Sequence, residues 1–206
     1  PKNNETCVYE EEILTNEVLN IIEKHDVSTS LFLFWSMHLV HMPLQVPQKY
    51  VDKFSFINNT YRRLNHAMGN LMDENVGKVI DLLKKRSIYD NALIVFHADN
   101  GGEIMGGGLC GGNNFPLKGG KFSNWEGGIR VNAFVTGGII PNEKVGTKIE
   151  HYITGWDWYA TYASIANIDP FDNMAANANL PGIDSINMWP LLSGKNNTSP
   201  RNEIII

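Results

Sequence analysis

Cysteine, positive charge and long apolar runs are all scarce in this chain, and each scarcity excludes a class of protein. The 206 residues include two cysteines, Cys7 and Cys110, which are too few for a disulfide framework and too far apart in sequence to predict a metal pair. Lys and Arg number 17 against 22 Asp and Glu, so the net charge of −5 predicts no nucleic-acid surface. No apolar run reaches the roughly 18 residues of a membrane span. The opening PKNNETC also lacks the apolar stretch of a signal peptide.

The rest of the composition is that of a globular protein, with 43% hydrophobic and 19% charged residues. The length fits one domain or a large part of one. Position 1 is proline instead of an initiator methionine, and the chain stops in NEIII, which reads as the middle of a strand. We therefore expect residues 1–206 to be one partial domain of a longer protein.

The pattern of apolar residues predicts alternating helices and buried strands. Helical spacing predicts helices at 9–24, 58–86, 156–166 and 188–192. Continuous apolar runs predict strands at 31–35, 91–96, 129–135 and 204–206. The glycine-rich stretch 101–120 has no periodicity and is predicted to be a loop. Such alternation favours an α/β layered fold with a mainly parallel sheet.

The segment FHADNGGEIMGGG, at positions 96–108, places Asp99 and Asn100 directly after a predicted strand. Ligands of open α/β sheets bind beyond the carboxyl ends of strands, and His41 follows another predicted strand after a short loop. A carboxylate beside an amide oxygen suits Ca²⁺ or Mg²⁺ better than zinc or copper. Glycines would let a bulky charged group approach the backbone. Asp-Asn-Gly-Gly is equally ordinary turn chemistry, so the residues alone leave both interpretations open.

Two further side chains could carry chemistry. Lys121, in LKGGKFSNWEGGIR, could balance an anionic substrate such as sulfate or phosphate. The alternative is a solvated surface lysine. His41 taken alone is as readily a structural histidine as a ligand, and Glu126 and Arg130, four residues apart, could simply pair with each other.

The chain also carries sequons for N-glycosylation, at Asn4, Asn58, Asn196 and Asn197. Short sequons arise by chance in an Asn-rich chain. They nonetheless favour a secreted or lysosomal-type compartment.

Three ordered segments together resemble the sulfatase family, most closely enzymes of the arylsulfatase B type. LFLFWSMHLVHMPLQVPQKY is similar to that group's His-x-Pro-Leu-Gln-Val-Pro segment, and LMDENVGKVIDLLKKRSIYDNALIVFHADNGGE to its long helix, strand and Asp-Asn-Gly-Gly turn. GGNNFPLKGGKFSNWEGGIRV resembles the Lys-x-Ser-x-Trp-Glu-Gly-Gly run. The resemblance covers nearly the whole chain and weakens between 171 and 179. It implies an alkaline-phosphatase-like three-layer α/β sandwich and a secreted or lysosomal-type home.

The resemblance also implies roles for single residues. Asp99 and Asn100 would be ligands of a divalent cation, usually Ca²⁺, with Mg²⁺ as the other hard cation. Lys121 would contact the sulfate of a sulfated small molecule or glycan and stabilise the leaving oxygen, and His41 would face the sulfate from the other side as a hydrogen-bond donor or general acid. These groups can neutralise charge that builds on sulfuryl oxygens.

One departure from the family pattern limits the prediction. The family's nucleophile is a formylglycine made from the cysteine of Cys-x-Pro-Ser-Arg, and neither Cys7 nor Cys110 is followed by that motif. The family's paired aspartates are absent too, so we expect the chain alone to bind the cation weakly and to turn over no substrate. Two alternatives stay open: a phosphoryl hydrolase of the same superfamily, and a non-catalytic protein that binds sulfated glycans. His97, two residues before Asp99, is a further residue that could reach the site.

Overall fold

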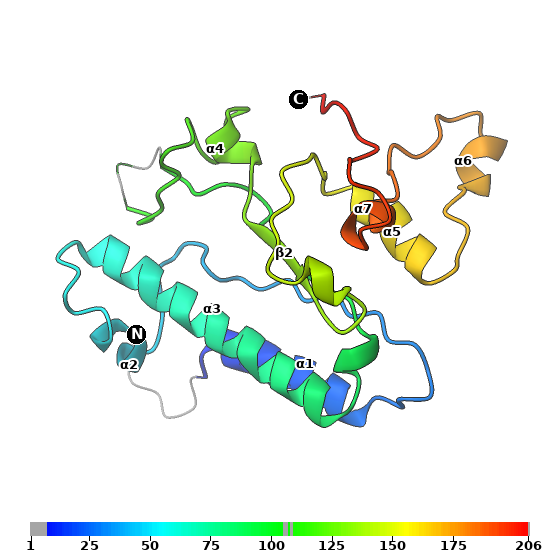
Figure 1. The fold of residues 1–206 in the computed structure, drawn as a ribbon. Coiled ribbons are helices and arrows are strands. Elements are labelled where there is room, and N and C mark those ends of the chain that lie inside the picture. The colour runs from blue at the N-terminus through cyan, green and yellow to red at the C-terminus, as the bar shows by residue number, and fades with distance from the viewer. Residues whose placement is uncertain (1–7, 105–106, 108, 206) are drawn as a thin grey trace. The chain divides into compact units, whose positions relative to one another are not determined.

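The computed structural model describes residues 8–104, 107 and 109–205 of the chain (Figure 1). Cys7 and the sequon at Asn4 lie outside the described residues. The chain divides into two compact units, residues 1–137 and 138–206, and each is described by itself. The prediction that they form one partial catalytic domain stays a prediction.

The first unit holds four helices, a 3₁₀ turn and two strands in its described part. In chain order they are α1 (Glu10–Lys24), α2 (Gln48–Asp52), α3 (Thr60–Lys85), η1 (Tyr89–Asn91), β1 (Ile94–His97), α4 (Glu126–Ile129) and β2 (Ala133–Thr136). The helices predicted at 9–24 and 58–86 are thus confirmed as α1 and α3. The loop predicted at 101–120 has neither helix nor strand among its described residues.

Helices α1 and α3 lie side by side and form the core of this unit (Figure 1). Val18 and Ile22 of α1 pack in one apolar cluster with Leu83 near the end of α3. Tyr9, just before α1, packs against a second cluster that contains Ala67 and Leu71 in the first half of α3. The start of α1 therefore lies nearer the first half of α3 and its end lies near the end of α3, so the two helices run parallel.

The segment LFLFW at 31–35 is not a strand, contrary to the prediction. Leu33 and Trp35 pack against the cluster of Val18, Ile22 and Leu83, whereas the Phe34 side chain is 79% exposed. A strand requires a hydrogen-bonded neighbour, and in the described part of the chain no strand pairs with this segment. Its alternating residues therefore have one covered side instead of the two that a continuous apolar run predicts.

The two strands pair antiparallel, with Ile94 opposite Thr136 and His97 opposite Ala133. Phe96 and Phe134 stack across the pair with ring centroids 5.0 Å apart. The strand predicted at 91–96 is thus found at Ile94–His97. The one predicted at 129–135 is found at Ala133–Thr136, since Ile129 ends α4 and residues 130–132 have no regular structure. This single pair neither confirms nor contradicts a three-layer sandwich with a mainly parallel sheet.

The second unit consists of η2 (Asn142–Lys144), α5 (Asp157–Ile165), α6 (Asn173–Asn177) and α7 (Trp189–Leu192) in its described part. Helices α5 and α7 confirm the predictions at 156–166 and 188–192. The strand predicted at 204–206 is not found, since residues 201–205 have no regular structure and residue 206 lies outside the described part. Helix α6 was not predicted, although Asp172 signals it by capping the amides of Met174 and Ala175, both at 2.9 Å.

Two surface features bear on the remaining predictions. The sequon residues Asn58, Asn196 and Asn197 are exposed, and their glycosylation stays a prediction. Within the described ranges, no helix combines the length and apolar character needed to cross a bilayer.

Candidate functional site

The predicted metal ligands lie in the turn that follows β1. The backbone N–H of Asn100 donates to Asp99 Oδ1 at 2.8 Å, and Asn100 Nδ2 donates to the Gly101 carbonyl at 3.0 Å. These bonds use one carboxylate oxygen and the amide nitrogen. Among the described residues, Asp99 Oδ2 and Asn100 Oδ1 accept no hydrogen bond, so both hard oxygens remain available to a cation. Asp99 and Asn100 can therefore form this turn and still bind a cation.

The glycines of this region allow backbone to pack against backbone. A Cβ on Gly101 would overlap the carbonyl oxygen of Gly127, and one on Gly120 would overlap that of Gly102. Hydrogen bonds join the same stretches, with the Gly101 N–H donating to the Gly128 carbonyl at 2.8 Å. The contact between two loops is thus enough to explain Gly101 and Gly120, and the approach of a bulky charged group to this backbone stays a prediction.

The contact between these loops places Lys121 beside the Asp-Asn turn. The Lys121 N–H donates to the Gly102 carbonyl at 3.1 Å, two residues after Asn100. Asn114, which the sequence analysis did not single out, holds the same point: its side chain accepts from the Gly102 N–H at 2.9 Å and donates to the Gly102 carbonyl at 2.8 Å and to the Gly119 carbonyl at 3.0 Å. Its position in the Gly-Gly-Asn-Asn run of this loop is the sequence signal that could have identified Asn114.

The two predicted sulfate-contacting residues lie in contact, although 80 positions separate them. Lys121 Nζ is 3.0 Å from His41 Nε2. His41 Nδ1 lies 2.8 Å from the Met42 carbonyl, which can only accept, so Nδ1 carries the ring proton. Nε2 is then an acceptor for the lysine ammonium. In this arrangement the ring donates toward a substrate from Nε2 only after Nε2 gains a proton.

Two glutamates of α1 contact His38, at the start of the loop that carries His41. Glu11 Oε1 accepts from the His38 N–H at 2.7 Å, and Glu10 Oε2 lies 3.0 Å from His38 Nδ1. The hydrogen bond and charge of Glu10 raise the pKa of His38. The His38 carbonyl in turn accepts from the His41 N–H at 2.8 Å and closes the turn. Neither glutamate was singled out in the sequence, because both lie in an ordinary acidic first turn of a helix.

Cys110 lies in the glycine-rich loop but is not suited to be a nucleophile. The thiol is buried, and this burial, together with the Glu103 carboxyl, raises its pKa. The loop is tied to α3 instead, since Arg62 Nη1 donates to the Gly111 carbonyl at 3.3 Å. The remaining cysteine, Cys7, lies outside the described residues.

The donor set near β1 fits a hard cation in kind but not in number. Asp99 and Asn100 offer two oxygens, where Ca²⁺ takes about six to eight. Nowhere in the described part do three His, Cys, Asp or Glu side chains gather into a metal site. His97 is exposed, and its Nδ1 lies 2.9 Å from the Ala98 carbonyl. Glu126 and Arg130 pair with each other, Nη1 to Oε2 at 3.4 Å, as their spacing predicts.

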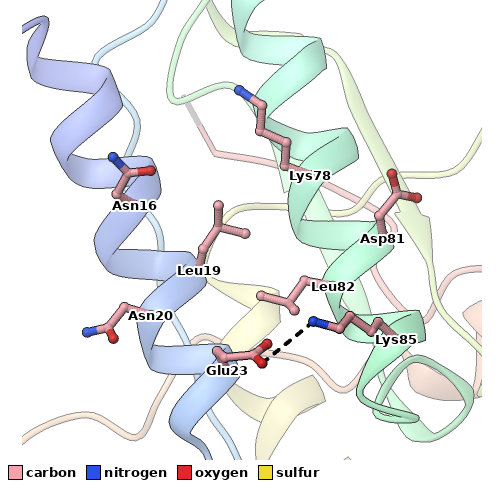
Figure 2. A pocket seen from close by; sticks show the side chains of 8 residues that line it. All are labelled: Asn16, Leu19, Asn20, Glu23, Lys78, Asp81, Leu82 and Lys85. Atoms are coloured by element: carbon pink, nitrogen blue, oxygen red, sulfur yellow. Dashed lines mark ion pairs between the residues drawn. The ribbon is translucent and has the colours of Figure 1, made fainter.

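An open groove lies between α1 and α3, and its lining residues are not those of the candidate site (Figure 2). It is lined by Asn16, Leu19, Asn20, Glu23, Lys78, Asp81, Leu82 and Lys85. Glu23 and Lys85 form an exposed ion pair across it, at 3.7 Å. None of the predicted site residues lines this groove.

Comparison with known proteins supports the family that the order of the motifs indicates. The family model described as Sulfatase matches residues 1–168, which is most of the chain and includes all the candidate catalytic and metal-binding residues. The chain belongs to the sulfatase family. This membership places it in the alkaline-phosphatase-like superfamily that the resemblance implied, while the three-layer sheet stays a prediction.

Individual relatives show the same relationship. The chain is 33% identical to arylsulfatase J of Mus musculus over 198 residues and 27% identical to N-acetylgalactosamine-6-sulfatase of Homo sapiens over 187 residues. Among solved structures it resembles Ps i-CgsB in complex with k-i-k-neocarrahexaose, with a TM-score of 0.80 and 32% identity over 96% of this chain. The chain spans 31% and 33% of the length of the two sulfatases and 41% of that solved chain.

Proposed function

We propose that this chain contributes the cation and sulfate half of a sulfatase active site, in a protein that hydrolyses sulfate esters of phenols or sugars. The contact between Lys121 and His41 carries the proposal, because it unites two motifs that the family resemblance had linked only by order. The Lys121 backbone is bonded to Gly102, beside Asp99 and Asn100. The closeness of these two backbone segments supports a shared site for the cationic, hydrogen-bonding and hard-oxygen groups.

Each residue has a role that follows from its chemistry. The Lys121 ammonium would attract the sulfate and stabilise negative charge on its oxygens and on the leaving oxygen. His41 would accept from Lys121 and, once protonated at Nε2, donate to the ester. Asp99 Oδ2 and Asn100 Oδ1 would bind Ca²⁺ or Mg²⁺, a cation that supplies positive charge to the sulfuryl oxygens.

The nucleophile of this proposal is a formylglycine in a longer form of the chain, since neither cysteine here is followed by Pro-Ser-Arg at the family spacing. Asn100 favours sulfate over phosphoryl hydrolysis by a zinc pair, because an amide oxygen suits Ca²⁺ or Mg²⁺ better than zinc. The carbohydrate ligand of Ps i-CgsB and the name N-acetylgalactosamine-6-sulfatase support a sugar sulfate as substrate. A secreted or lysosomal-type compartment, with glycosylation at the exposed sequons, belongs to the same proposal.

Hydrolysis of an aryl sulfate tests the proposal. The 206-residue chain with Ca²⁺ should release no product, whereas a longer form that carries Cys-x-Pro-Ser-Arg should turn over the ester. In that form Lys121→Ala should lower kcat about 100-fold or more, the loss expected for a charge-stabilising donor. The matched control Lys195→Ala, at an exposed lysine of the second unit, should leave the rate unchanged.

Two results would overturn the proposal. A rate in Lys121→Ala within a few-fold of the parent would remove Lys121 from the reacting groups. A longer form that binds a sulfated glycan but hydrolyses no ester would make the protein a binder instead of an enzyme.

A further inference from the structure

The first turn of α1 holds the loop that carries His41 at both of its ends. Glu11 binds the His38 N–H at 2.7 Å, and the Tyr9 hydroxyl donates to the Gln45 carbonyl at 2.7 Å. Burial, followed by the nearby glutamates, raises the pKa of Tyr9 to about 12, so this hydroxyl remains a donor at neutral pH. His41 lies between these two attachments.

Glu11 is an unusual residue for a place in the core. Its side chain is 2% exposed, and its second oxygen, Oε2, is buried with no hydrogen-bond partner in the described part of the structure. A buried polar atom without a partner costs the fold free energy. Stability alone therefore does not explain a carboxylate at this position, where an apolar side chain would continue the stripe of Val18 and Ile22.

Three other buried polar atoms of this unit also lack a partner among the described residues. They are Thr15 Oγ1, Trp35 Nε1 and Asn75 Nδ2. Thr15 lies one turn after Glu11 on α1, and Asn75 lies on α3 between Leu71 and Leu83, which belong to the two apolar clusters. Along each helix, Thr15 and Asn75 therefore lie between residues that pack in the two apolar clusters.

We propose that Glu11 is a positioning residue for His41. Its carboxylate fixes the His38 amide, the His38 carbonyl fixes the His41 amide at 2.8 Å, and the imidazole is thereby held with Nε2 at Lys121 Nζ. Glu11 touches neither the sulfate nor the cation of the proposed reaction and acts only through this loop. The inference rests on the proposed function for the use of His41, but the placement of the ring can be measured without any reaction.

Nuclear magnetic resonance of the 206-residue chain tests the placement directly. In the parent chain, His41 should show one tautomer, with the proton on Nδ1 and Nε2 accepting. Glu11→Leu fills the space but removes the acceptor, so the His38 amide should exchange with solvent about tenfold faster. His41 should then show mixed tautomers. Glu11→Gln keeps an oxygen for His38 and should restore both signals, and the control Glu17→Ala, at an exposed residue of the same helix, should change neither.

The outcomes separate positioning from stability and from function. Parent-like His38 exchange and His41 tautomer in Glu11→Leu would overturn the proposal, and so would global loss of folding in that variant, because Glu11 would then serve the fold. Titration of the parent chain with inorganic sulfate tests the proposed function separately from the positioning role. If sulfate left His41 and Lys121 unchanged while Glu11→Leu still released the ring, the proposed function would fail and the positioning role would stand.

Discussion

The Lys121 side chain and His41 ring meet because two loops, each fixed by backbone hydrogen bonds, converge on them. Lys121 is held through the Gly102 carbonyl, and His41 through the His38 turn. Either side chain alone is common at a protein surface, since lysines are mostly solvated and histidines have many structural uses. Their contact at 3.0 Å is what distinguishes them from such residues.

His38 gives a pH-dependent signal close to this contact. Its hydrogen bond to Glu10 raises its pKa above the ordinary value of about 6.5. The pair therefore stabilises the fold fully below that ordinary value and loses its effect as pH rises through the raised pKa. A titration of the His38 ring protons should give a midpoint above that of an unfolded peptide, and Glu10→Gln should return it to the ordinary range. A midpoint that Glu10→Gln leaves unchanged would refute the pairing.

The sequence indicates candidate site residues, whose roles stay predictions, but not the contacts that surround them. Short motifs in a fixed order make four residues recognisable as candidates: Asp99, Asn100, Lys121 and His41. Asn114 and Glu11 are not, because their partners lie 12 and 27 residues away and are backbone atoms. Such contacts leave no periodic or local pattern in a sequence.

The helices were predictable and one apolar segment was not, for a physical reason. Helices α1 and α3 make their hydrogen bonds internally, so their apolar stripes identify them. Residues 31–35 carry the composition of a buried strand, but a strand forms only against a neighbour. In the described structure they cover α1 and α3 with Leu33 and Trp35 instead.

The N-terminal cap of α3 tests how much a single local hydrogen bond stabilises a helix. Asn59 caps it by accepting from the Arg62 N–H at 2.9 Å. Asn59→Ala should lower the free energy of unfolding by about 1 kcal/mol, because the amide of the first turn loses its acceptor. Urea denaturation followed by circular dichroism measures this change. Asn59→Asp, which preserves the cap, is the control, and an equal loss in both variants would contradict the capping role.

The second unit is organised around a buried ion pair. The Asp157 carboxylate accepts from Arg201 Nε at 2.8 Å and Nη2 at 2.6 Å, and from the Thr154 and Ile186 amides. Burial alone would raise the pKa of Asp157, but these hydrogen bonds outweigh it and lower the pKa. Its contribution to stability is therefore present above about pH 3.8 and is lost as pH falls through the lowered value.

Acid and mutation should accordingly destabilise this unit. Arg201→Met, which leaves Asp157 buried without its partner, should cost about 3–5 kcal/mol, because an unpaired buried charge is unfavourable. Trp158, buried in α5, reports the transition by fluorescence. Glu150→Gln, which breaks the exposed pair with Lys148, should shift the midpoint little. An equal effect of the two variants would contradict a central role for the buried pair.

The central claim for the whole chain is that it carries one half of a cation and sulfate site, built from Asp99, Asn100, Lys121 and His41. The most direct test is a titration of the isotope-labelled 206-residue chain, first with CaCl₂ and then with sodium sulfate, followed by nuclear magnetic resonance. We predict weak binding, with Ca²⁺ shifting Asp99 and Asn100 and sulfate shifting Lys121 and His41, because two protein ligands leave most of the about six to eight calcium positions to solvent. Shifts confined to other acidic or basic residues, such as the Glu10–Glu12 turn of α1, with these four unchanged, would contradict it.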